Sequence, residues 1–308
     1  MEISVSTSIA GLLRAVDLQE ALETAAEAGF RLLDFPLSVF SRAPDSPLRQ
    51  PDWLRWAENV KKTLTGMGLR VTQAHAAWDQ AIPLDLYEAP PDPLYPRTIA
   101  ACRALGCEKL VFHPPLYFFP TEDRAGRQRV IQWNIRWFRA LLPDLERYRV
   151  TAELENLFDY RRVQPAGGPP FPFTTQEDMM ELCDGVNSPW VRLCLDTGHG
   201  NIAGQDVPGM VRAYGSRLQV LHLNDNYGKI GPIYEDLHLF PGYGALDWGE
   251  IFRALRETGF SGVFNLEPVS ALPGQSRPVR VLQLRAAREI ALQLAEAAGF
   301  LGADSEHK

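Results

Sequence analysis

The 308-residue sequence predicts an α/β protein that folds as a (β/α)8 TIM barrel in a single domain. Short segments rich in β-branched and aliphatic residues alternate eight times with segments of helical periodicity. Five of the six histidines, together with several carboxylates, stand at or just after the ends of the predicted strands. In a barrel these ends meet at one mouth. No G-x-G-x-x-G motif follows the first strand, which weighs against a dinucleotide-binding fold.

The first four strand-helix units have short apolar strands, as expected for parallel strands that are covered on both faces. Gly29 should stop the first helix, because glycine readily takes the left-handed conformation that ends a helix. Asp52 is a plausible N-cap of the second helix, ahead of an aromatic and aliphatic stripe. The strands are expected at residues 2–7, 30–36, 69–75 and 109–113, and the helices at 17–28, 52–67, 96–105 and 127–148.

The last four units repeat this pattern. Pro143 should end or kink the fourth helix late, because proline removes a backbone donor and clashes with the preceding turn. The strands are expected at residues 149–156, 191–196, 218–223 and 262–267, and the helices around 176–183 and at 208–215, 247–258 and 280–298. Residues 1–300 should therefore form the barrel, and residues 301–308 a polar C-terminal tail.

Composition limits the class of function. The net charge of −7 and the pI near 5.5 argue against non-specific affinity for nucleic acid, because neutralising phosphates requires surplus lysine and arginine. No apolar run approaches the roughly 18 residues that span a bilayer, and no secretory pattern follows Met1. The four cysteines lack zinc or redox spacing and are expected to be buried free thiols. We expect a cytoplasmic protein with no membrane partner and no nucleic-acid partner.

The residues at the predicted strand ends are types that bind divalent metal ions. Neutral imidazoles and carboxylates that converge on one point form such a site. The candidates are His75, His113, Glu155, Asp196, His199, His222, Asp236, His238 and Glu267.

Each of these positions also has an ordinary structural interpretation. Glu153 and Glu155 share one strand face, and either could be a salt-bridged barrel glutamate, although Glu155 is nearer the mouth. Asp196 could be a helix N-cap, and His222 a satisfied core histidine. Trp78, in the loop after the third strand, could stack on a sugar ring or pack on the barrel rim.

The motifs around these residues resemble the sugar phosphate isomerase/epimerase superfamily, the xylose isomerase-like TIM barrel group, over nearly the whole chain. They are E-N at Glu155, L-D-T-G-H at 195–199, H-L-N-D at 222–225, D-x-H-x-x-P-G-x-G at 236–244 and L-E-P at 266–268. The resemblance implies one divalent ion, Mn²⁺, Mg²⁺, Co²⁺ or Zn²⁺, held by Glu155, Asp196, His222 and Glu267. It also implies a catalytic or substrate-contacting His199, and it is compatible with a homo-oligomer.

The activity that the resemblance implies is isomerisation or epimerisation of a small keto-sugar or cyclitol, by proton abstraction next to a carbonyl through an enediolate. As in the ketose 3-epimerases of the group, Glu155 and Glu267 would move the proton. Those enzymes carry an arginine six residues after the strand-seven histidine, where this chain has Gly228. The other mouth residues would bind substrate or a second ion: His75, His113, His199, Asp236, His238 and Trp78.

Three other functions remain open at this point. A metal-dependent dehydratase or lyase of an inosose, a dehydroshikimate-like compound or an oxidised glycoside would share the enolate chemistry. The nine candidate ligands also resemble the three-zinc pattern of endonuclease IV, although the acidic chain and the scarcity of lysine and arginine near the motifs weigh against a nuclease. A non-catalytic sugar-binding barrel predicts loss of the ligands, and the set here is complete.

Overall fold

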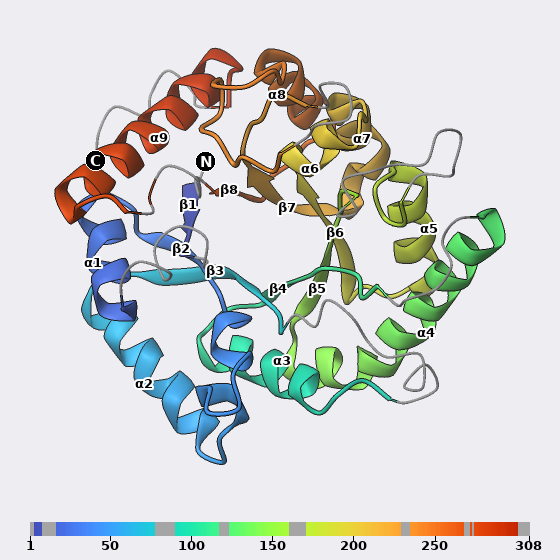
Figure 1. Cartoon of the computed structure of the whole chain (residues 1–308), viewed down its shortest axis with the longest axis horizontal. Coiled ribbons are helices and arrows are strands. Elements are labelled where there is room, and N and C mark those ends of the chain that lie inside the picture. Colours follow the sequence, from blue (N-terminus) through green and yellow to red (C-terminus); the bar gives the residue numbers. More distant parts are fainter. Residues whose placement is uncertain are drawn as a thin grey trace.

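Eight parallel strands close into a barrel in a computed structural model of the chain, and helices surround them (Figure 1). The structure describes residues 3–7, 17–77, 90–116, 123–159, 171–228, 235–267, 272 and 274–300. The strands pair in sequence order, and the last pairs with the first, which confirms the predicted (β/α)8 barrel. They are β1 (Ile3–Ser6), β2 (Leu32–Phe35), β3 (Arg70–His75), β4 (Lys109–Phe112), β5 (Thr151–Glu155), β6 (Val191–Asp196), β7 (Leu218–Leu223) and β8 (Val263–Leu266).

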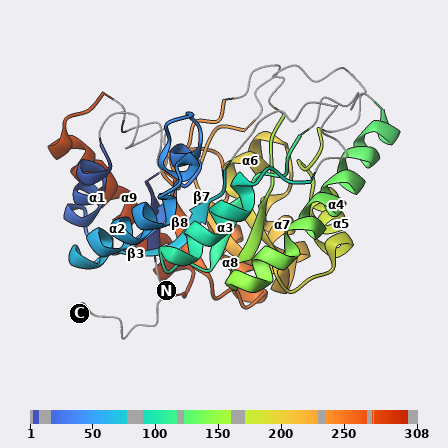
Figure 2. The ribbon, with the colours of Figure 1, turned by 90° about the horizontal axis from the view of Figure 1, so that it is seen from below.

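The helices lie along the outside of the strands, as the side view shows (Figure 2). They are α1 (Leu18–Glu27), α2 (Trp53–Gly66), α3 (Leu94–Ala104), α4 (Arg124–Tyr148), α5 (Gln176–Val186), α6 (Thr197–Ile202), α7 (Val207–Tyr214), α8 (Trp248–Glu257) and α9 (Arg277–Ala297). Most of the predicted elements are found within a few residues of their expected ends. The short helix α6 was not predicted.

Two of the predicted helix signals hold only in part. Asp52 occupies the N-cap position of α2, as predicted, but its side chain makes no capping hydrogen bond. Helix α4 runs through Pro143 to Tyr148 and ends only where Arg149 adopts a left-handed conformation, with φ of 53°. The lone proline therefore does not end the helix. One face of α4 is buried along most of its length, and this packing holds the helix together across the missing backbone donor.

Irregularities in register place polar side chains at the mouth. The pairing of β2 with β3 shifts between Leu33 and Asp34, which sets Asp34 beside Gln73. The pairing of β6 with β7 shifts after Leu193, and Asp196 consequently lies beside His222. Such shifts change which side chains face the same side of a sheet, so they determine which groups meet inside the barrel.

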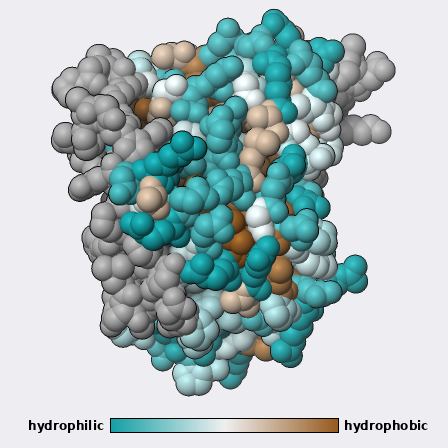
Figure 3. Space-filling view, turned by 90° about the vertical axis from the view of Figure 1, so that its right-hand side faces the viewer, coloured by the Kyte–Doolittle hydropathy of each residue, from teal (hydrophilic) through white to brown (hydrophobic). Residues whose placement is uncertain are grey.

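The main apolar core lies between the strands and the surrounding helices. A small separate cluster of Val111, Cys194 and Val220 comes from β4, β6 and β7. The outer face seen from the right-hand side of Figure 1 is mainly hydrophilic, with only small groups of apolar residues (Figure 3). Within the described part of the chain, no helix combines the length and apolarity needed to cross a membrane.

Phe264 is a suitable probe of this core. Its buried ring, on β8, lies 5.7 Å from the Phe252 ring and 5.5 Å from the rings of Phe260 and Phe300. We expect Phe264→Ala to lower the free energy of unfolding by about 3–5 kcal/mol, because it leaves a cavity among these rings. Denaturant unfolding measures the change, and Leu282→Ala, at an exposed position of α9, serves as the control. Equal losses in the two variants would contradict this account of the core.

Candidate functional site

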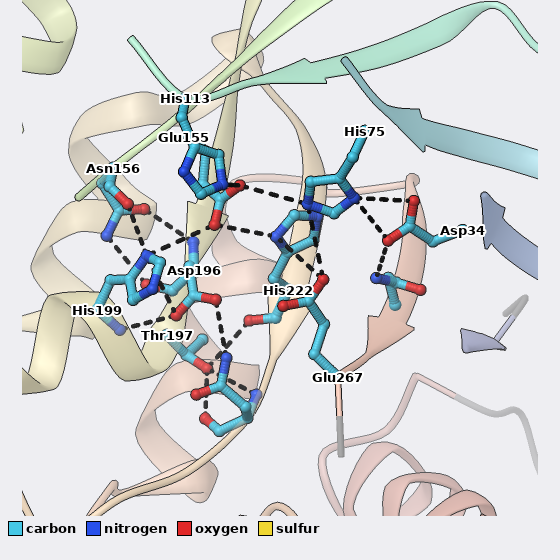
Figure 4. Close-up of polar contacts among 12 residues, drawn as sticks. Asp34, His75, His113, Glu155, Asn156, Asp196, Thr197, His199, His222 and Glu267 are labelled. Carbon is cyan, nitrogen blue, oxygen red and sulfur yellow. Dashed lines mark hydrogen bonds and ion pairs between the residues drawn. The ribbon is translucent and has the colours of Figure 1, made fainter. Parts of the chain in front are cut away.

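The structure brings the predicted metal-binding residues together at the carboxyl ends of the strands, and Figure 4 shows them apart from Asp236 and His238. All nine lie within the described residues, whereas Trp78 lies outside them, so its predicted role stays a prediction. His75, Glu155 and Asp196 are the last residues of β3, β5 and β6, and His222 is within β7. The remaining five follow strands: His113 after β4, His199 in α6, Asp236 and His238 after β7, and Glu267 after β8.

The centre of the site is formed by Glu155, His222 and Glu267. The Nδ1 atom of His222 lies 3.3 Å from Glu155 Oε1 and 3.6 Å from Glu267 Oε1. All three side chains are buried. His222 Nδ1 and Glu267 Oε1 make no hydrogen bond of good geometry with any described residue, and Glu155 Oε2 contacts only imidazole nitrogens among the described residues. Buried polar atoms are rarely left without a partner, so this convergence calls for a ligand or an ion.

Asp196 is held by a hydrogen-bond network at the end of β6. Its Oδ1 accepts from the backbone N–H of His199 at 2.7 Å, so the N-cap interpretation of Asp196 is correct. Its Oδ2 accepts from the Asn224 side chain at 2.8 Å, and the Asn156 side chain bonds both the N–H and the C=O of Asp196. The carboxylate is therefore fixed in place, and it lies close to His199 and His238.

Capping α6 does not prevent Asp196 from binding a metal ion. The hydrogen bonds from the His199 N–H and the Asn224 amide use one lone pair on each carboxylate oxygen, and the remaining lone pairs stay available to a cation. The network also explains Gly198: a Cβ atom there would lie 1.8 Å from Asn224 Oδ1. Only glycine lets α6 begin so close to the Asn224 amide.

His75 and His113 lie on the other side of Glu155. The Nε2 atom of His113 is 3.0 Å from Glu155 Oε2. His75 Nε2 lies 3.7 Å from Glu155 Oε2 and 3.8 Å from Glu267 Oε1, while its Nδ1 contacts the Asp34 carboxylate at 2.9 Å. His75, His113 and Glu155 form one group whose possible ligand atoms all lie within 4.8 Å of one another.

Asp34 is a site residue that the sequence interpretation missed. Its carboxylate is fully buried at the end of β2 and also accepts a 3.4 Å contact from the Asn265 amide. A carboxylate near the end of an apolar strand, here Leu32-Leu33-Asp34-Phe35, is the same signal that identified Asp196. An acid that holds one imidazole nitrogen orients the other toward a metal or substrate.

A third group consists of His199, Asp236 and His238. Asp236 Oδ2 lies 2.9 Å from His238 Nε2 and 3.5 Å from His199 Nε2. His199 Nδ1 is 2.9 Å from the Asn156 carbonyl, and the Phe158 ring lies 4.9 Å from the His199 ring. His238 has a φ of 44°, a conformation that costs energy in non-glycine residues and is enriched at functional sites.

The segment that carries Asp236 and His238 is anchored by Asp225, a second residue that the sequence interpretation missed. Asp225 is buried, and it exchanges two backbone hydrogen bonds with Leu239. Its carboxylate accepts from the N–H of Gly242 and from the Trp248 indole at 2.8 Å. These bonds tie the segment after β7 to the end of β7, which positions His238 over the site.

Burial and neighbouring charges shift the pKa values of the ionisable side chains in the site. Burial opposes ionisation of Glu155, but His113 and His222 outweigh it and hold the pKa of that carboxyl well below its usual value. Burial, with a smaller contribution from Glu155, raises the pKa of Glu267 despite the neighbouring histidines. Burial lowers the pKa of His222, but Glu267 and Glu155 more than compensate and raise it to about 9. The two buried carboxylates thus favour a positive charge between them, here that of the protonated His222 ring.

A divalent cation fits this donor set. It would replace the protons on the histidines, and the polar atoms of Glu155, His222 and Glu267 already converge. Of the four predicted ligands, Asp196 groups with His199 and His238, whereas Glu155 and Glu267 each group with His222. Cys194 lies within ligand distance of Glu155 and His222, but burial raises the pKa of its thiol well above the ordinary value.

Two other predictions concern groups outside the centre. The four cysteines are free and buried, as expected. Glu153 is fully buried but forms no salt bridge with a described residue; it accepts a 2.6 Å hydrogen bond from the Thr151 hydroxyl. The suggestion that Glu153 is a salt-bridged barrel glutamate is therefore wrong. Burial raises its pKa to about 7, although Thr151, Lys109 and Arg192 act in the opposite direction.

Comparisons with known proteins agree with this fold and identify the family. A family model described as xylose isomerase-like TIM barrel matches residues 22–285. An inosose isomerase from Bacillus subtilis (strain 168) is 27% identical over 167 residues, 54% of this chain and 55% of that protein. A D-psicose 3-epimerase from Enterocloster bolteae is 35% identical over 155 residues, 50% of this chain and 44% of that protein. The matches therefore span about half the length of these relatives.

Solved structures show the same fold. A D-tagatose 3-epimerase-like protein superposes with a TM-score of 0.71 at 19% identity, covering 97% of this chain and 99% of that one. The IOLI protein, whose crystal structure holds a zinc atom, gives a TM-score of 0.66 at 19% identity, with 97% and 98% covered.

Glu153 makes stability depend on pH. Because its folded-state pKa lies above the ordinary 4.5, its contribution to stability is complete below about pH 4.5 and is lost as the pH rises through about 7. Glu153→Gln removes this dependence. We expect its unfolding free energy, relative to wild type, to increase by about 3 kcal/mol between about pH 5 and about pH 8. Denaturant titrations at both pH values measure the change, and a constant difference would refute the assignment.

Proposed function

This chain belongs to the xylose isomerase-like TIM barrel family, and on that basis we propose that it is a divalent-metal-dependent isomerase or epimerase of a small keto-sugar or cyclitol. The relatives named inosose isomerase and D-psicose 3-epimerase support this class of reaction. The observation that carries the proposal is the pair of buried glutamates, Glu155 and Glu267, on either side of His222 Nδ1. Two carboxylates around one cation-binding position can place a proton acceptor and a proton donor beside the same carbon, which suits proton exchange there.

We assign the metal to Glu155, Asp196, His222 and Glu267. When bound, the ion supplies a Lewis acid that stabilises the negative charge of an enediolate. Glu267 Oε1 makes no hydrogen bond with a described donor, and Glu155 Oε2 contacts imidazole nitrogens, His113 Nε2 at 3.0 Å and His75 Nε2 at 3.7 Å, which can exchange a proton with it. A carboxylate with a free oxygen can hold or release a proton.

The proposed reaction transfers protons between carbon and carboxylate. Glu155 or Glu267, as the carboxylate, removes the proton from the carbon next to the substrate carbonyl; the C–H electron pair forms the C=C bond of the enediolate, and the carbonyl π pair moves to its oxygen. In an epimerisation the second glutamate, initially protonated, delivers its proton to the opposite face of the same carbon, and the carbonyl is restored. In an isomerisation the proton is returned to the former carbonyl carbon, while the proton of the adjacent hydroxyl moves to the former carbonyl oxygen, so that the new carbonyl forms at the adjacent carbon. His199 and His238 lie beside this centre and would bond substrate hydroxyls, with Phe158 forming an apolar wall.

Substitution of the glutamates tests this assignment. We expect Glu155→Gln and Glu267→Gln to lower turnover on a responsive keto-sugar or cyclitol by about 10²–10⁴-fold, because an amide cannot accept the proton. His113→Ala should be milder. Glu153→Gln is the matched control, because it makes the same change two residues from Glu155 outside the proposed centre. Turnover and exchange of substrate hydrogen with D₂O are the readouts, and near-normal turnover in either active-site variant would disprove the base assignment.

The same assay separates isomerisation from elimination. A product whose mass equals that of the substrate supports the isomerase or epimerase. A product lighter by one water, detected by mass spectrometry, would replace it with a dehydratase. Both reactions begin with the same proton abstraction, so the glutamate variants test a step that they share.

A second candidate function is favoured by the two additional groups of possible ligands, His75 with His113 and Glu155, and Asp196 with His199 and His238. If each group held zinc, the site would suit phosphodiester hydrolysis. We expect elemental analysis of the unchelated protein to find about one divalent ion per chain, as a single-metal isomerase requires. About three zinc ions, with cleavage of abasic duplex DNA, would make the hydrolase the better proposal.

A further inference from the structure

Gln73 reaches across the barrel to the central histidine. Its side chain, on β3, places Nε2 at 2.8 Å from Nε2 of His222 on β7. Gln73 is 1% exposed and His222 is fully buried, so water does not compete for this contact. The two side chains meet directly although 149 residues separate them in sequence.

This contact determines which nitrogen of His222 carries its proton. A neutral imidazole has one N–H and one lone pair, and only the lone pair can bind a metal ion. If the Gln73 amide nitrogen donates to Nε2, the imidazole proton must be on Nδ1, which points at Glu155 and Glu267. If the amide oxygen faces Nε2 instead, Nε2 carries the proton and Nδ1 keeps its lone pair. The oxygen and nitrogen of an amide occupy nearly the same space, so both orientations fit the same side-chain position.

We propose that Gln73 is a positioning residue that accepts the Nε2 proton of His222 through its amide oxygen and thereby presents Nδ1 as the metal-binding atom. The position of Nδ1 supports this assignment. His222 Nδ1, and not Nε2, lies between the two glutamates, 3.3 Å from Glu155 Oε1 and 3.6 Å from Glu267 Oε1. A cation held by these carboxylates therefore meets Nδ1, so the ring proton must be on Nε2 and Gln73 must present its oxygen.

His75 is oriented through its other ring nitrogen, Nδ1 instead of Nε2. Its ring lies 4.9 Å from the His222 ring, and its Nδ1 is bound by Asp34, so its Nε2 faces the same two glutamates. Asp34 and Gln73 are direct neighbours in the pairing of β2 with β3. Asp34 and Gln73, buried on adjacent strands, thus each hold one ring nitrogen. The nitrogens left to face the glutamates are Nε2 of His75 and Nδ1 of His222. The inference depends on the metal centre of the proposed function, but it does not depend on the substrate.

Two substitutions separate hydrogen bonding from packing. Gln73→Glu keeps an acceptor toward Nε2, and Gln73→Met fills a similar volume with no comparable acceptor. Gln219→Met is the matched control: Gln219 lies on the same strand as His222, but it is partly exposed near the amino-terminal end of β7, away from the mouth. Thermal unfolding of each variant without added metal identifies any that fail to fold.

The readouts are zinc affinity by calorimetry and the ring-nitrogen NMR spectrum of ¹⁵N-histidine-labelled full-length protein, titrated with Zn²⁺ alone. In wild type and Gln73→Glu we expect His222 to bind zinc through Nδ1 and to carry a proton on Nε2. Gln73→Met should bind zinc about 10–100-fold more weakly, as expected for loss of a group that orients a ligand. Gln219→Met should match wild type.

Three results would overturn the inference. Zinc bound to Nε2 of His222 in wild type would do so, and so would wild-type zinc affinity in folded Gln73→Met. If Gln73→Met does not fold, a Gln73→Glu variant that loses the Nδ1–zinc pattern would be decisive. Wild type that takes up no metal would instead refute the metal-dependent function itself. Normal zinc chemistry without turnover of any keto-sugar or cyclitol would refute only the proposed substrate class.

Discussion

Burial of two glutamates around one histidine is the constraint on which the rest of the site depends. Glu155 and Glu267 lie away from water at the carboxyl ends of β5 and β8, with His222 Nδ1 between them. Isolated carboxylates in such a position would cost several kcal/mol each or would be neutralised. The surrounding imidazoles offset this cost by offering positive charge. A divalent cation offsets it more completely, because it satisfies both carboxylates and leaves the histidines neutral.

The residues around this centre serve mainly to hold it in place. Asn156 and Asn224 fix the Asp196 backbone and carboxylate, and Asp225 anchors the segment that carries His238. Asp34 and Gln73 hold one nitrogen each of His75 and His222. All these supports come from strands or from the residues directly after them. A site built in this way is more rigid than one built on loops, which suits a reaction that must keep two carboxylates on opposite sides of one carbon.

The residues that stabilise the barrel are largely different from the residues of the candidate site. The apolar contacts that hold the fold together lie between strands and helices, as in the ring cluster around Phe264. Buried polar atoms without a hydrogen bond lie at the mouth, as on His222, and also on the surrounding helices, as on Tyr214. The left-handed His238 is at the mouth. The unfavourable energy of such groups at the mouth is compensated by packing elsewhere, and ligand or metal binding would recover part of it. Glu153 places a further buried carboxyl in a barrel strand, outside the proposed centre.

Sequence by itself determined the barrel and most of the candidate site, because both depend on local signals. Strand and helix periods, and polar residues at the ends of apolar strands, identified eight units and nine candidate ligands. Tertiary structure alone decided how those ligands are grouped. Two register shifts, after Leu33 and after Leu193, set Asp34 beside Gln73 and Asp196 beside His222. It also decided that Asp196 caps α6 and that Gln73 meets His222 across 149 residues of sequence. Such contacts depend on how the closed sheet aligns distant strands, which no local pattern encodes.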